Sequence, residues 1–394
     1  MARLEDITGK AISGEWGLDD EDATGIPVLR TTNFTNDGVI NFSNVVTRTI
    51  TKKDLSSKYL RPGDIIIEKS GGSDKQPVGR VVYYEEEPNR YLFNNFTGVL
   101  RIMNPNLWNS KYVFYALYAN YLKGGTRKYQ NKTTGLHNLK TEQYVREFDL
   151  RECSIQEQRQ IVFILDKLSE VISLRKEQLS KLDELVKARF VEMFGDPVQN
   201  PFGWTTRSLL EMGYCKNGMN FHTGDSGIEM HCLGVGDFKD YSVIDGTDYL
   251  PTVSLNEAPP EESMLHDGDI VFVRSNGNKA LVGRCLVVYP RKTPTTYSGF
   301  CIRYRLTNGE VNTTYLLRVL KTDSMRKKMV GRGANIQNLN QQILATLDIP
   351  TPPMGLQEQF AAFVEQINKS KLTIQQSLDK LEMLKKSLMQ EYLG

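Results

Sequence analysis

Carboxylates beside a lysine are the first residues of this sequence that could do chemistry. The stretch "PGDIIIEK" (62–69) resembles the P-D…E-x-K pattern with which metal-dependent nucleases hold their ion. In that pattern one residue separates the glutamate from the lysine, but Glu68 and Lys69 are adjacent. The related stretch later in the chain has Val273 and Arg274 at these places. Since a metal site needs its carboxylates, we do not expect nuclease chemistry here.

Other catalytic or metal-binding patterns are incomplete. His222, His231 and Cys232 are close in sequence, but a fourth ligand at usable spacing is missing, and none of the five cysteines forms a CxxC pair. "NPFGW" (200–204) lacks the second proline of an amino-methyltransferase motif. "GVGDF" (234–238) lacks the context of a dinucleotide loop, and neither GxxxxGK[ST] nor GxSxG occurs. We therefore expect no catalytic residue and no metal site, and a function in binding.

Basic residues gather twice in the chain. Between Lys111 and Lys140 there are six lysines and arginines and no acid, and the stretch is rich in Gly, Asn and Thr. A second basic cluster runs from Arg326 to Arg332. Cations neutralise phosphates, and small residues allow the backbone to approach them, so each cluster predicts a loop that contacts DNA. A solvated loop would look similar when taken alone, but the recurrence favours DNA.

A variable loop accompanies each basic cluster. "EKSGGSDKQPVGR" and "VRSNGNKALVGR" share framework residues but differ at their tips, where Lys, Arg, Asn and Gln could read base edges. The candidate DNA-binding residues are Lys69, Lys75, Arg80, Arg127, Lys128, Lys132, Arg274, Asn276, Lys279, Arg284, Arg326, Lys327, Lys328 and Arg332.

These residues lie in an internal repeat of about 200 residues. "YLRPGDIIIEKSGG" (59–72) matches "MLHDGDIVFVRSNG" (264–277), "NNFTGVLRI" (94–102) matches "TTYSGFCIRY" (295–304), and "TTGLHNLKTEQ" (133–143) matches "GANIQNLNQQI" (333–343). "QEQ" at 156–158 and 357–359 and "LSKLDELVK" (179–187) with "LDKLEMLKK" (378–386) follow in the same order. Each copy begins with short β-rich runs punctuated by Gly and Asn, which predict a mixed α/β part. The tyrosines of "KYVFYALYANYLK" (111–123) have helical spacing and are expected to pack in its core.

Each copy ends in a long predicted helix. Apolar residues recur at a spacing of four and three residues, which is typical of a coiled-coil seam. The first seam is Leu165, Leu168, Ile172, Leu179, Leu182, Val186 and Met193, interrupted by Arg175 and Arg189; the second is Phe360, Phe363, Ile367, Ile374, Leu378, Leu381 and Leu388. One such helix cannot bury its seam alone, so the two are expected to pack on each other. If a pseudo-two-fold axis relates the copies, they pack antiparallel.

Composition agrees with a globular protein of about two domains. The chain has 394 residues, of which 24% are charged and 40% hydrophobic, and a net charge of +2. No apolar run approaches the roughly 20 residues that span a bilayer, and the first residues lack the apolar core of a signal peptide. We expect a cytoplasmic location and no membrane contact.

Taken together, these features make the whole chain similar to the specificity subunit of type I restriction–modification systems. The resemblance rests on the order of globular parts and "QEQ" helices, on the paired "GDI" strands, and on "HNL" and "QNL" before the helices. It implies an α+β fold with two mixed α/β target recognition domains, at 1–152 and 196–354. These are separated by two conserved helices, at 153–195 and 355–394, which form an antiparallel coiled coil. "NPFGW" (200–204) fits the P-x-G-W start of a recognition domain, but the first copy lacks this pattern.

The resemblance also implies partners and cofactors. Each recognition domain would read one half of a bipartite target in double-stranded DNA. The helices would space the halves and bind two modification subunits, through which restriction subunits join. S-adenosylmethionine, ATP and Mg²⁺ would belong to those partners, and none to this chain. A recognition subunit of a type IIB-like restriction enzyme has the same architecture and stays open, as does a stand-alone DNA-binding regulator, although no recognition-helix motif supports it.

Overall fold

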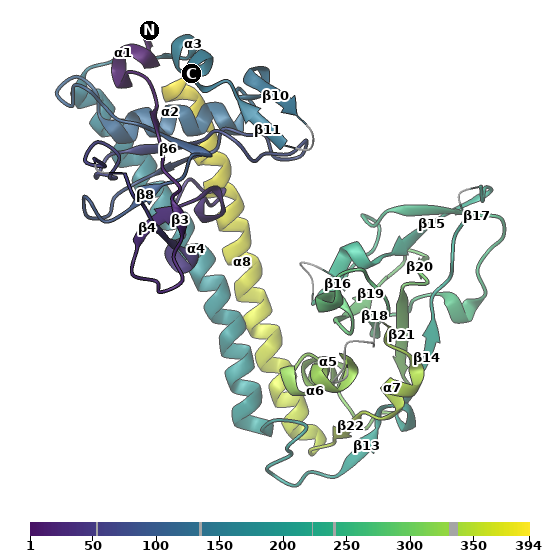
Figure 1. Ribbon diagram of the computed structural model, residues 1–394. Helices are drawn as coiled ribbons and strands as arrows, with labels where there is room; N and C mark the ends of the chain where they lie inside the picture. Colours follow the sequence, from purple (N-terminus) through teal and green to yellow (C-terminus); the bar gives the residue numbers. More distant parts are fainter. Residues whose placement is uncertain (53, 134–135, 223, 239–241, 331–337) are drawn as a thin grey trace. The chain divides into compact units, whose positions relative to one another are not determined.

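The structure is a computed structural model that describes residues 1–52, 54–133, 136–222, 224–238, 242–330 and 338–394 (Figure 1). The chain divides into two compact units. Unit 1 contains Met1–Glu177 and Gln375–Gly394, and unit 2 contains Gln178–Ile374. Each unit therefore holds a mixed α/β part and a segment of both long helices.

Unit 1 contains two four-stranded sheets among its described residues. The first has the order β2 (Ile12–Ser13), β9 (Thr97–Leu100), β6 (Ile65–Glu68) and β7 (Val81–Tyr83). The second has the order β3 (Leu18–Asp19), β5 (Val46–Thr49), β4 (Ile26–Leu29) and β8 (Leu92–Phe93). Two-stranded pairs join β1 (Ala2–Arg3) to β12 (Asp149–Leu150) and β10 (Gln130–Thr133) to β11 (Leu136–Leu139). The helices are α1 (Leu4–Thr8), α2 (Ser110–Leu122) and α3 (Thr141–Glu147), with 3₁₀ turns at Thr31–Asn33 (η1), Phe42–Asn44 (η2) and Arg127–Tyr129 (η3).

Unit 2 repeats this plan. Its larger sheet has the order β14 (Gly213–Asn217), β21 (Cys301–Leu306), β18 (Asp269–Val273), β19 (Cys285–Tyr289) and β16 (Val243–Asp245). Its smaller sheet has the order β17 (Thr252–Leu255), β15 (Ile228–Leu233) and β20 (Thr295–Tyr297), and β13 (Thr206–Ser208) pairs with β22 (Asp348–Pro350). The helices are α5 (Thr313–Leu320), α6 (Asp323–Val330) and α7 (Gln341–Ala345), with 3₁₀ turns at Leu209–Glu211 (η4), Val235–Phe238 (η5), Glu261–Ser263 (η6) and Lys279–Leu281 (η7).

The "GDI" strands β6 and β18 occupy equivalent places in the two units. Each is antiparallel to the two strands that flank it, β7 and β9 in unit 1 and β19 and β21 in unit 2. Every residue of both strands is buried, which explains their unbroken apolar runs. The duplication predicted from the sequence is confirmed by this shared topology.

Helix α2 carries the tyrosines whose spacing predicted a buried helix. Asn109 caps its first turn by accepting hydrogen bonds from the backbone N–H groups of Lys111 and Tyr112. Tyr112, Tyr115 and Tyr118 are all buried. Their hydroxyl groups donate to Arg151 O, Asp166 Oδ1 and Asn36 O. The prediction that these rings pack inside the protein is confirmed, so they are not a stacking platform for bases.

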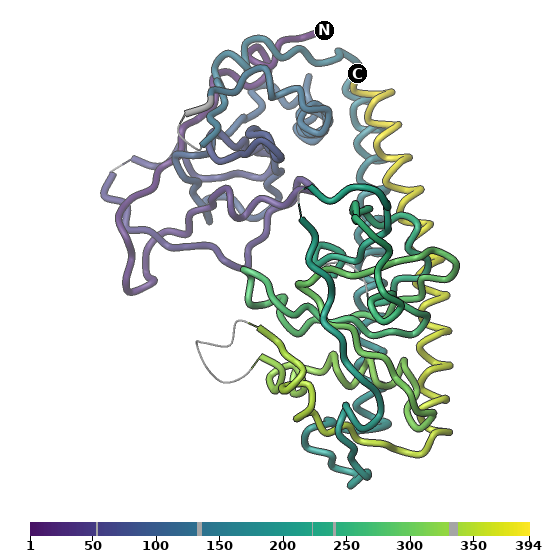
Figure 2. Tube along the Cα trace, turned by 90° about the vertical axis from the view of Figure 1, so that its right-hand side faces the viewer, coloured from purple at the N-terminus to yellow at the C-terminus, as the bar shows by residue number. Residues whose placement is uncertain are grey.

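Two long helices, α4 (Ile155–Phe194) and α8 (Met354–Leu393), each pass through both units. In unit 1, Leu165 and Met389 share one core, and Lys176 forms an ion pair with Glu382 at 3.2 Å. In unit 2, Lys371 pairs with Asp183 at 2.7 Å, and the rings of Phe190 and Phe360 are 5.5 Å apart. Within each unit, residue numbers fall along α8 as they rise along α4. The helices are therefore antiparallel, as predicted (Figure 2).

The predicted seams are the buried faces of these helices. All nine residues singled out for the seam are buried or half-buried: Leu165, Leu168, Ile172, Leu179, Leu182, Phe363, Ile367, Leu378 and Leu381. Arg175 and Arg189, which interrupt the apolar pattern, are also half-buried. The pattern of apolar residues thus identified the packing face correctly.

A buried glutamine fastens each long helix to its α/β part, and it corrects the sequence match. Gln158 Oε1 accepts from Asn109 N at 2.8 Å, and its amide donates to Leu107 O and Cys153 O. Gln357 Oε1 accepts from Asn312 N at 2.8 Å, and its amide donates to two further carbonyls. Gln158 is the last residue of the first "QEQ", whereas Gln357 is the first of the second. Matching the triplets letter by letter is therefore wrong by two residues.

Candidate nucleic-acid interface

The acidic residue of each "GDI" motif binds a half-buried arginine. Asp64 accepts two hydrogen bonds from Arg101, both at 2.7 Å, and Asp269 accepts two from Arg305, both at 2.8 Å. Both carboxylates are 1% exposed, so each needs this partner to offset the loss of water. In both units, the aspartate of the motif thus ties the start of its strand to an arginine at the end of the neighbouring strand, β9 or β21.

Glu68, the second carboxylate of the nuclease-like stretch, is also engaged. Its side chain is buried and accepts from Arg80, which also donates to the carbonyls of Phe34 and Thr31. Burial opposes the charge of Arg80, but the hydrogen bond and attraction of Glu68 raise the pKa of its guanidinium. Arg80 was predicted to contact DNA, but its guanidinium donates hydrogen bonds to groups inside the protein.

The loop after each "GDI" strand is anchored in the same way in both units. The backbone N–H groups of Lys69 and Ser70 donate to Phe96 O, and those of Arg274 and Ser275 donate to Phe300 O. Ser70 bridges to Asn138, and Ser275 bridges to Asn338. The "HNL" and "QNL" motifs thus hold the start of each loop, which explains why they recur.

The basic clusters lie against these loops. In unit 1, Arg127 of η3 donates to Asp74 O at 3.4 Å, inside the loop that carries Lys75. In unit 2, Arg326 donates to Ala280 O and Val282 O, both at 3.1 Å, beside Lys279. The structure therefore joins two segments that the sequence analysis had identified separately. We call each assembly a loop junction: residues 69–80 with Arg127 and Lys128 in unit 1, and residues 274–284 with 326–328 in unit 2.

The second basic cluster is not the loop that the sequence predicted. Arg326, Lys327 and Lys328 belong to helix α6, which is short, amphipathic and anchored by the buried side chains of Met325 and Met329. The sequence signal was misread because closely spaced cations hid this apolar spacing. Arg332 lies outside the described residues, and Lys132 lies in β10 with its side chain outside them.

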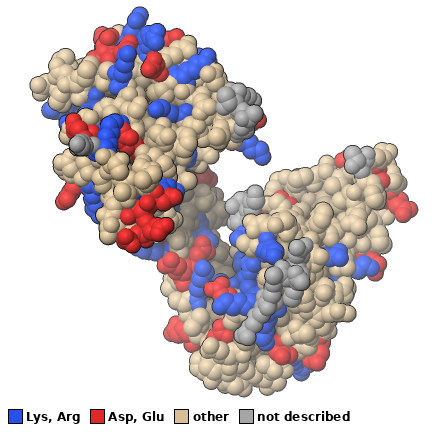
Figure 3. All heavy atoms as spheres, viewed as in Figure 1, with Lys and Arg blue, Asp and Glu red and all other residues tan. Residues whose placement is uncertain are grey.

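The remaining candidates differ in exposure. The exposed ones are Lys75, Arg127, Lys128, Lys279, Lys327 and Lys328, and the half-buried ones are Lys69, Arg80, Arg274, Asn276, Arg284 and Arg326. Burial, together with repulsion from Lys58, lowers the pKa of Lys69. Lys and Arg side chains reach the visible surface of both units (Figure 3). Lys75, Lys128, Lys327 and Lys328 carry their charges at exposed positions, where phosphates could reach them.

Two exposed phenylalanines were missed by the sequence analysis. Phe96 and Phe300 are 50% and 60% exposed, and their carbonyls accept the two N–H groups at the start of each loop. Matching the glycines of "NNFTG" and "TTYSG" sets Phe96 against Tyr297, which is fully buried. The hydrogen bonds instead make Phe96 equivalent to Phe300. Each loop junction therefore adds an exposed ring to its cations.

Two of the residues considered for a metal site, His231 and Cys232, have other surroundings in the structure. His231 Nδ1 lies 2.8 Å from Leu250 O, and Cys232 is buried, which raises the pKa of its thiol to about 12. Among the described residues, no group of three His, Cys, Asp or Glu side chains is placed to hold a metal ion. In the same part of the chain, no helix is both long enough and apolar enough to cross a membrane.

Comparison with known proteins identifies the family. The profile described as "Type I restriction modification DNA specificity domain" matches residues 1–184 and 239–383. The StySPI specificity subunit of Salmonella potsdam is 26% identical over 399 residues, which cover 94% of this chain and 81% of that protein. The EcoKI specificity subunit of Escherichia coli K12 is 24% identical, covering 87% of this chain and 75% of that protein.

Solved structures share the fold. The crystal structure of the S subunit from M. genitalium has a TM-score of 0.56 at 14% identity, covering 100% of this chain and 95% of the other. A chain from a structure on complex assembly and conformational transition of the type I R-M system has a TM-score of 0.57 at 14% identity, covering 99% and 96%. The family profile spans most of the sequence, so the chain belongs to the type I restriction–modification DNA specificity family and is a specificity subunit.

Proposed function

We propose that each unit reads one half of a bipartite target in double-stranded DNA through its loop junction. The observation that carries this proposal is the recurrence of one arrangement in both units. An anchored loop, a neighbouring basic segment and an exposed phenylalanine occur together each time. The anchors match between the units, while the loop tips differ in sequence. A constant frame with variable tips suits two different half-sites, because phosphate contacts set the position and base contacts set the sequence.

The long helices are the proposed docking surface for two modification subunits, through which restriction subunits join. Outside the buried seam, both helices expose large apolar side chains: Phe163, Ile164, Val171, Leu174, Leu185 and Val191 on α4, and Leu372, Met383 and Leu384 on α8. Exposed apolar side chains gathered on an element are typical of protein interfaces. The chain itself would be non-catalytic and cytoplasmic. S-adenosylmethionine, ATP and Mg²⁺ would be bound by the partners.

Co-purification with the neighbouring modification subunit tests this function. We expect a complex of two modification subunits to one specificity subunit by light scattering, and tight, sequence-specific binding of duplex DNA by that complex. The free chain, with its net charge of +2, should bind DNA weakly because strong non-specific binding needs dense phosphate neutralisation. Tight, specific binding by the free chain, or failure to recruit a methyltransferase, would contradict the proposal.

A further inference from the structure

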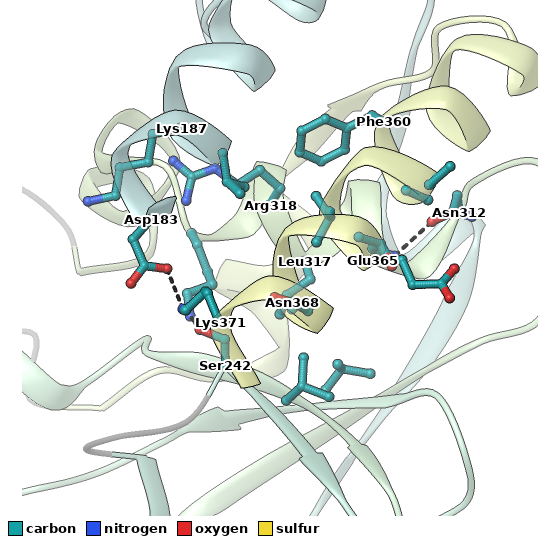
Figure 4. Close-up of a pocket in the computed structure, with 18 of the residues that line it drawn as sticks. Asp183, Lys187, Ser242, Asn312, Leu317, Arg318, Phe360, Glu365, Asn368 and Lys371 are labelled. Carbon is teal, nitrogen blue, oxygen red and sulfur yellow. Dashed lines mark hydrogen bonds and ion pairs between the residues drawn. The ribbon is translucent and has the colours of Figure 1, made fainter. Parts of the chain in front are cut away.

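Unit 2 contains a cavity of about 770 Å³ that the proposed function does not use (Figure 4). It is bounded by α5, by β16 and β19, and by segments of α4 and α8 that belong to the same unit. Its wall is partly apolar, with Leu317 and Val364, and partly charged, with Arg318 and Lys321. This volume falls within the roughly 300–1,000 Å³ of small-molecule sites in proteins.

Two cations line the cavity, Arg318 of α5 and Lys321 at the C-terminal end of that helix, and neither forms an ion pair with a carboxylate among the described residues. The Nε atom of Arg318 is buried and has no hydrogen-bond partner, and Lys321 donates to the hydroxyl of Ser242. Burial lowers the pKa of both side chains, so each charge is incompletely compensated. Both residues are half-buried, and a cation that is partly removed from water without a paired carboxylate favours a bound anion.

Two of the three acidic residues on the cavity wall are paired with lysines. Asp183 pairs with Lys371 at 2.7 Å, and Glu365 pairs with Lys369 at 2.7 Å. Glu358 is the third carboxylate on the wall, and Lys187 adds a further cation. With Lys371, the wall carries four cations against three carboxylates.

Unit 1 provides an internal comparison, because its helix α2 is the equivalent of α5. The helices begin after the equivalent caps Asn109 and Asn312, so Tyr115 corresponds to Arg318 and Tyr118 corresponds to Lys321. Both tyrosine hydroxyls have hydrogen-bond acceptors inside unit 1. The two cations are thus a feature of unit 2 and not of the shared frame.

In the unit 1 cavity, the cation beside these two tyrosines comes from a different helix. Lys385 of α8 lies over the rings of Tyr115 and Tyr118, at 5.9 Å and 5.7 Å from their centres. The repeat places Val186 at the equivalent position of α4. That cavity is about 380 Å³, and its wall contains Asp37, Glu85, Asp166 and Glu170. Lys111 also lines that cavity, but it is paired with Glu85 and Asp166. The acids of the unit 1 cavity therefore outnumber its two cations, whereas the cavity of unit 2 has Arg318 and Lys321 in place of the two tyrosines.

We propose that the cavity of unit 2 binds a small phosphate-bearing molecule. Arg318 and Lys321 contact its phosphate, since the guanidinium and ammonium groups supply charge-assisted hydrogen bonds. Leu317 and Val364 contact its apolar portion. Such a ligand would occupy a site in the specificity subunit that is separate from the two loop junctions.

Titration calorimetry of the full chain tests the proposal, with inorganic pyrophosphate and adenosine triphosphate as probes. We expect at least one probe to bind with a dissociation constant below about 1 mM. Arg318→Gln should weaken that binding about ten-fold or more, because a charged hydrogen-bond donor is lost. The matched control is Lys385→Gln in the equivalent cavity of unit 1, which should leave the affinity unchanged.

Three results would overturn the proposal. The first is that neither probe binds at about 5 mM. The second is that the wild-type chain and Arg318→Gln bind equally well. The third is that Lys385→Gln weakens binding as much as Arg318→Gln does. If Arg318→Gln fails to fold, Arg318→Lys replaces it. This variant keeps the charge and should retain partial binding, whereas Lys321→Gln should lose binding. Displacement of pyrophosphate by a short duplex DNA would assign the two cations to the DNA interface and would also overturn the proposal.

Discussion

Phe96 and Phe300 are the residues whose role is easiest to separate from stability. Both rings are at least half exposed, so replacing them with alanine removes little buried area. We expect Phe96→Ala or Phe300→Ala to weaken specific DNA binding by the assembled complex about ten-fold, since an apolar or stacking contact contributes about 1–3 kcal/mol. Binding would be measured by fluorescence anisotropy. Leu107→Ala, which removes another exposed apolar side chain of unit 1, should bind like the wild type. Equal losses in all three variants would contradict a specific role.

The exposed lysines of α6 should act on affinity without altering specificity. Lys327 and Lys328 are exposed on a helix whose other face is buried, so their replacement by alanine leaves α6 intact. Each lost phosphate contact lowers the slope of log affinity against log salt by nearly one unit. We expect the double variant to lower this slope by up to about two. Lys292→Ala, beyond the other end of β19, is the control and should leave the slope unchanged. An unchanged slope in the double variant would mean that these lysines are only solvated.

At the residue scale, the sequence located the cations but not their partners. The spacing of Arg80 and Glu68 along the chain contains no sign that they would form an ion pair across the loop between β6 and β7. Phe96 escaped notice because a single exposed phenylalanine is unremarkable in a sequence, and the nearby glycines suggested the wrong alignment. Only the hydrogen bonds to its carbonyl, repeated at Phe300, reveal the equivalence.

At the element scale, Gln158 and Gln357 join each long helix to its α/β part. Gln158→Leu would leave one backbone donor and two backbone acceptors without a partner, which costs about 2–3 kcal/mol in the free energy of unfolding. Gln156→Leu makes the same chemical change two residues away at an exposed position and should cost far less. The pair Gln357→Leu and Gln359→Leu repeats the test in unit 2. Scanning calorimetry would measure the melting of all four variants, and equal melting within a pair would refute the anchoring role.

The long helices were predictable because their apolar residues recur over many turns, and each seam needs a partner. The order of the strands could not be predicted. A short apolar run such as "DIIIE" indicates that a strand is buried, but not which neighbouring strands cover it. Helix α6 was missed for a related reason: only two buried methionines mark its inner face. Local patterns therefore predicted the elements with long periods and failed where one or two tertiary contacts decide the structure.

At the scale of the whole molecule, the duplication separates two properties of the DNA target. Each unit carries its own loop junction, and α4 and α8 pass through both units. Replacing residues 196–354 by another recognition domain should change one half-sequence and leave the spacer between the halves unchanged. Changing the length of the helices should alter the spacer and leave both half-sequences unchanged. The two kinds of variant can be compared by mapping methylated sites across a genome.

Lengthening the helices is the sharper of these tests. The ion pair between Lys176 and Glu382 marks one level of the antiparallel pair, so seven residues would be inserted after Leu174 in α4 and seven after Glu382 in α8. Seven residues keep the apolar seam in register and add about 10 Å to each helix. Because duplex DNA rises about 3.4 Å per base pair, the preferred spacer should grow by roughly three base pairs, with both half-sequences retained. Insertion into α4 alone should disrupt the seam and abolish methylation, since the added apolar residues have no partner. New half-sequences, or an unchanged spacer in the double insertion, would show that the helices do not set the spacing.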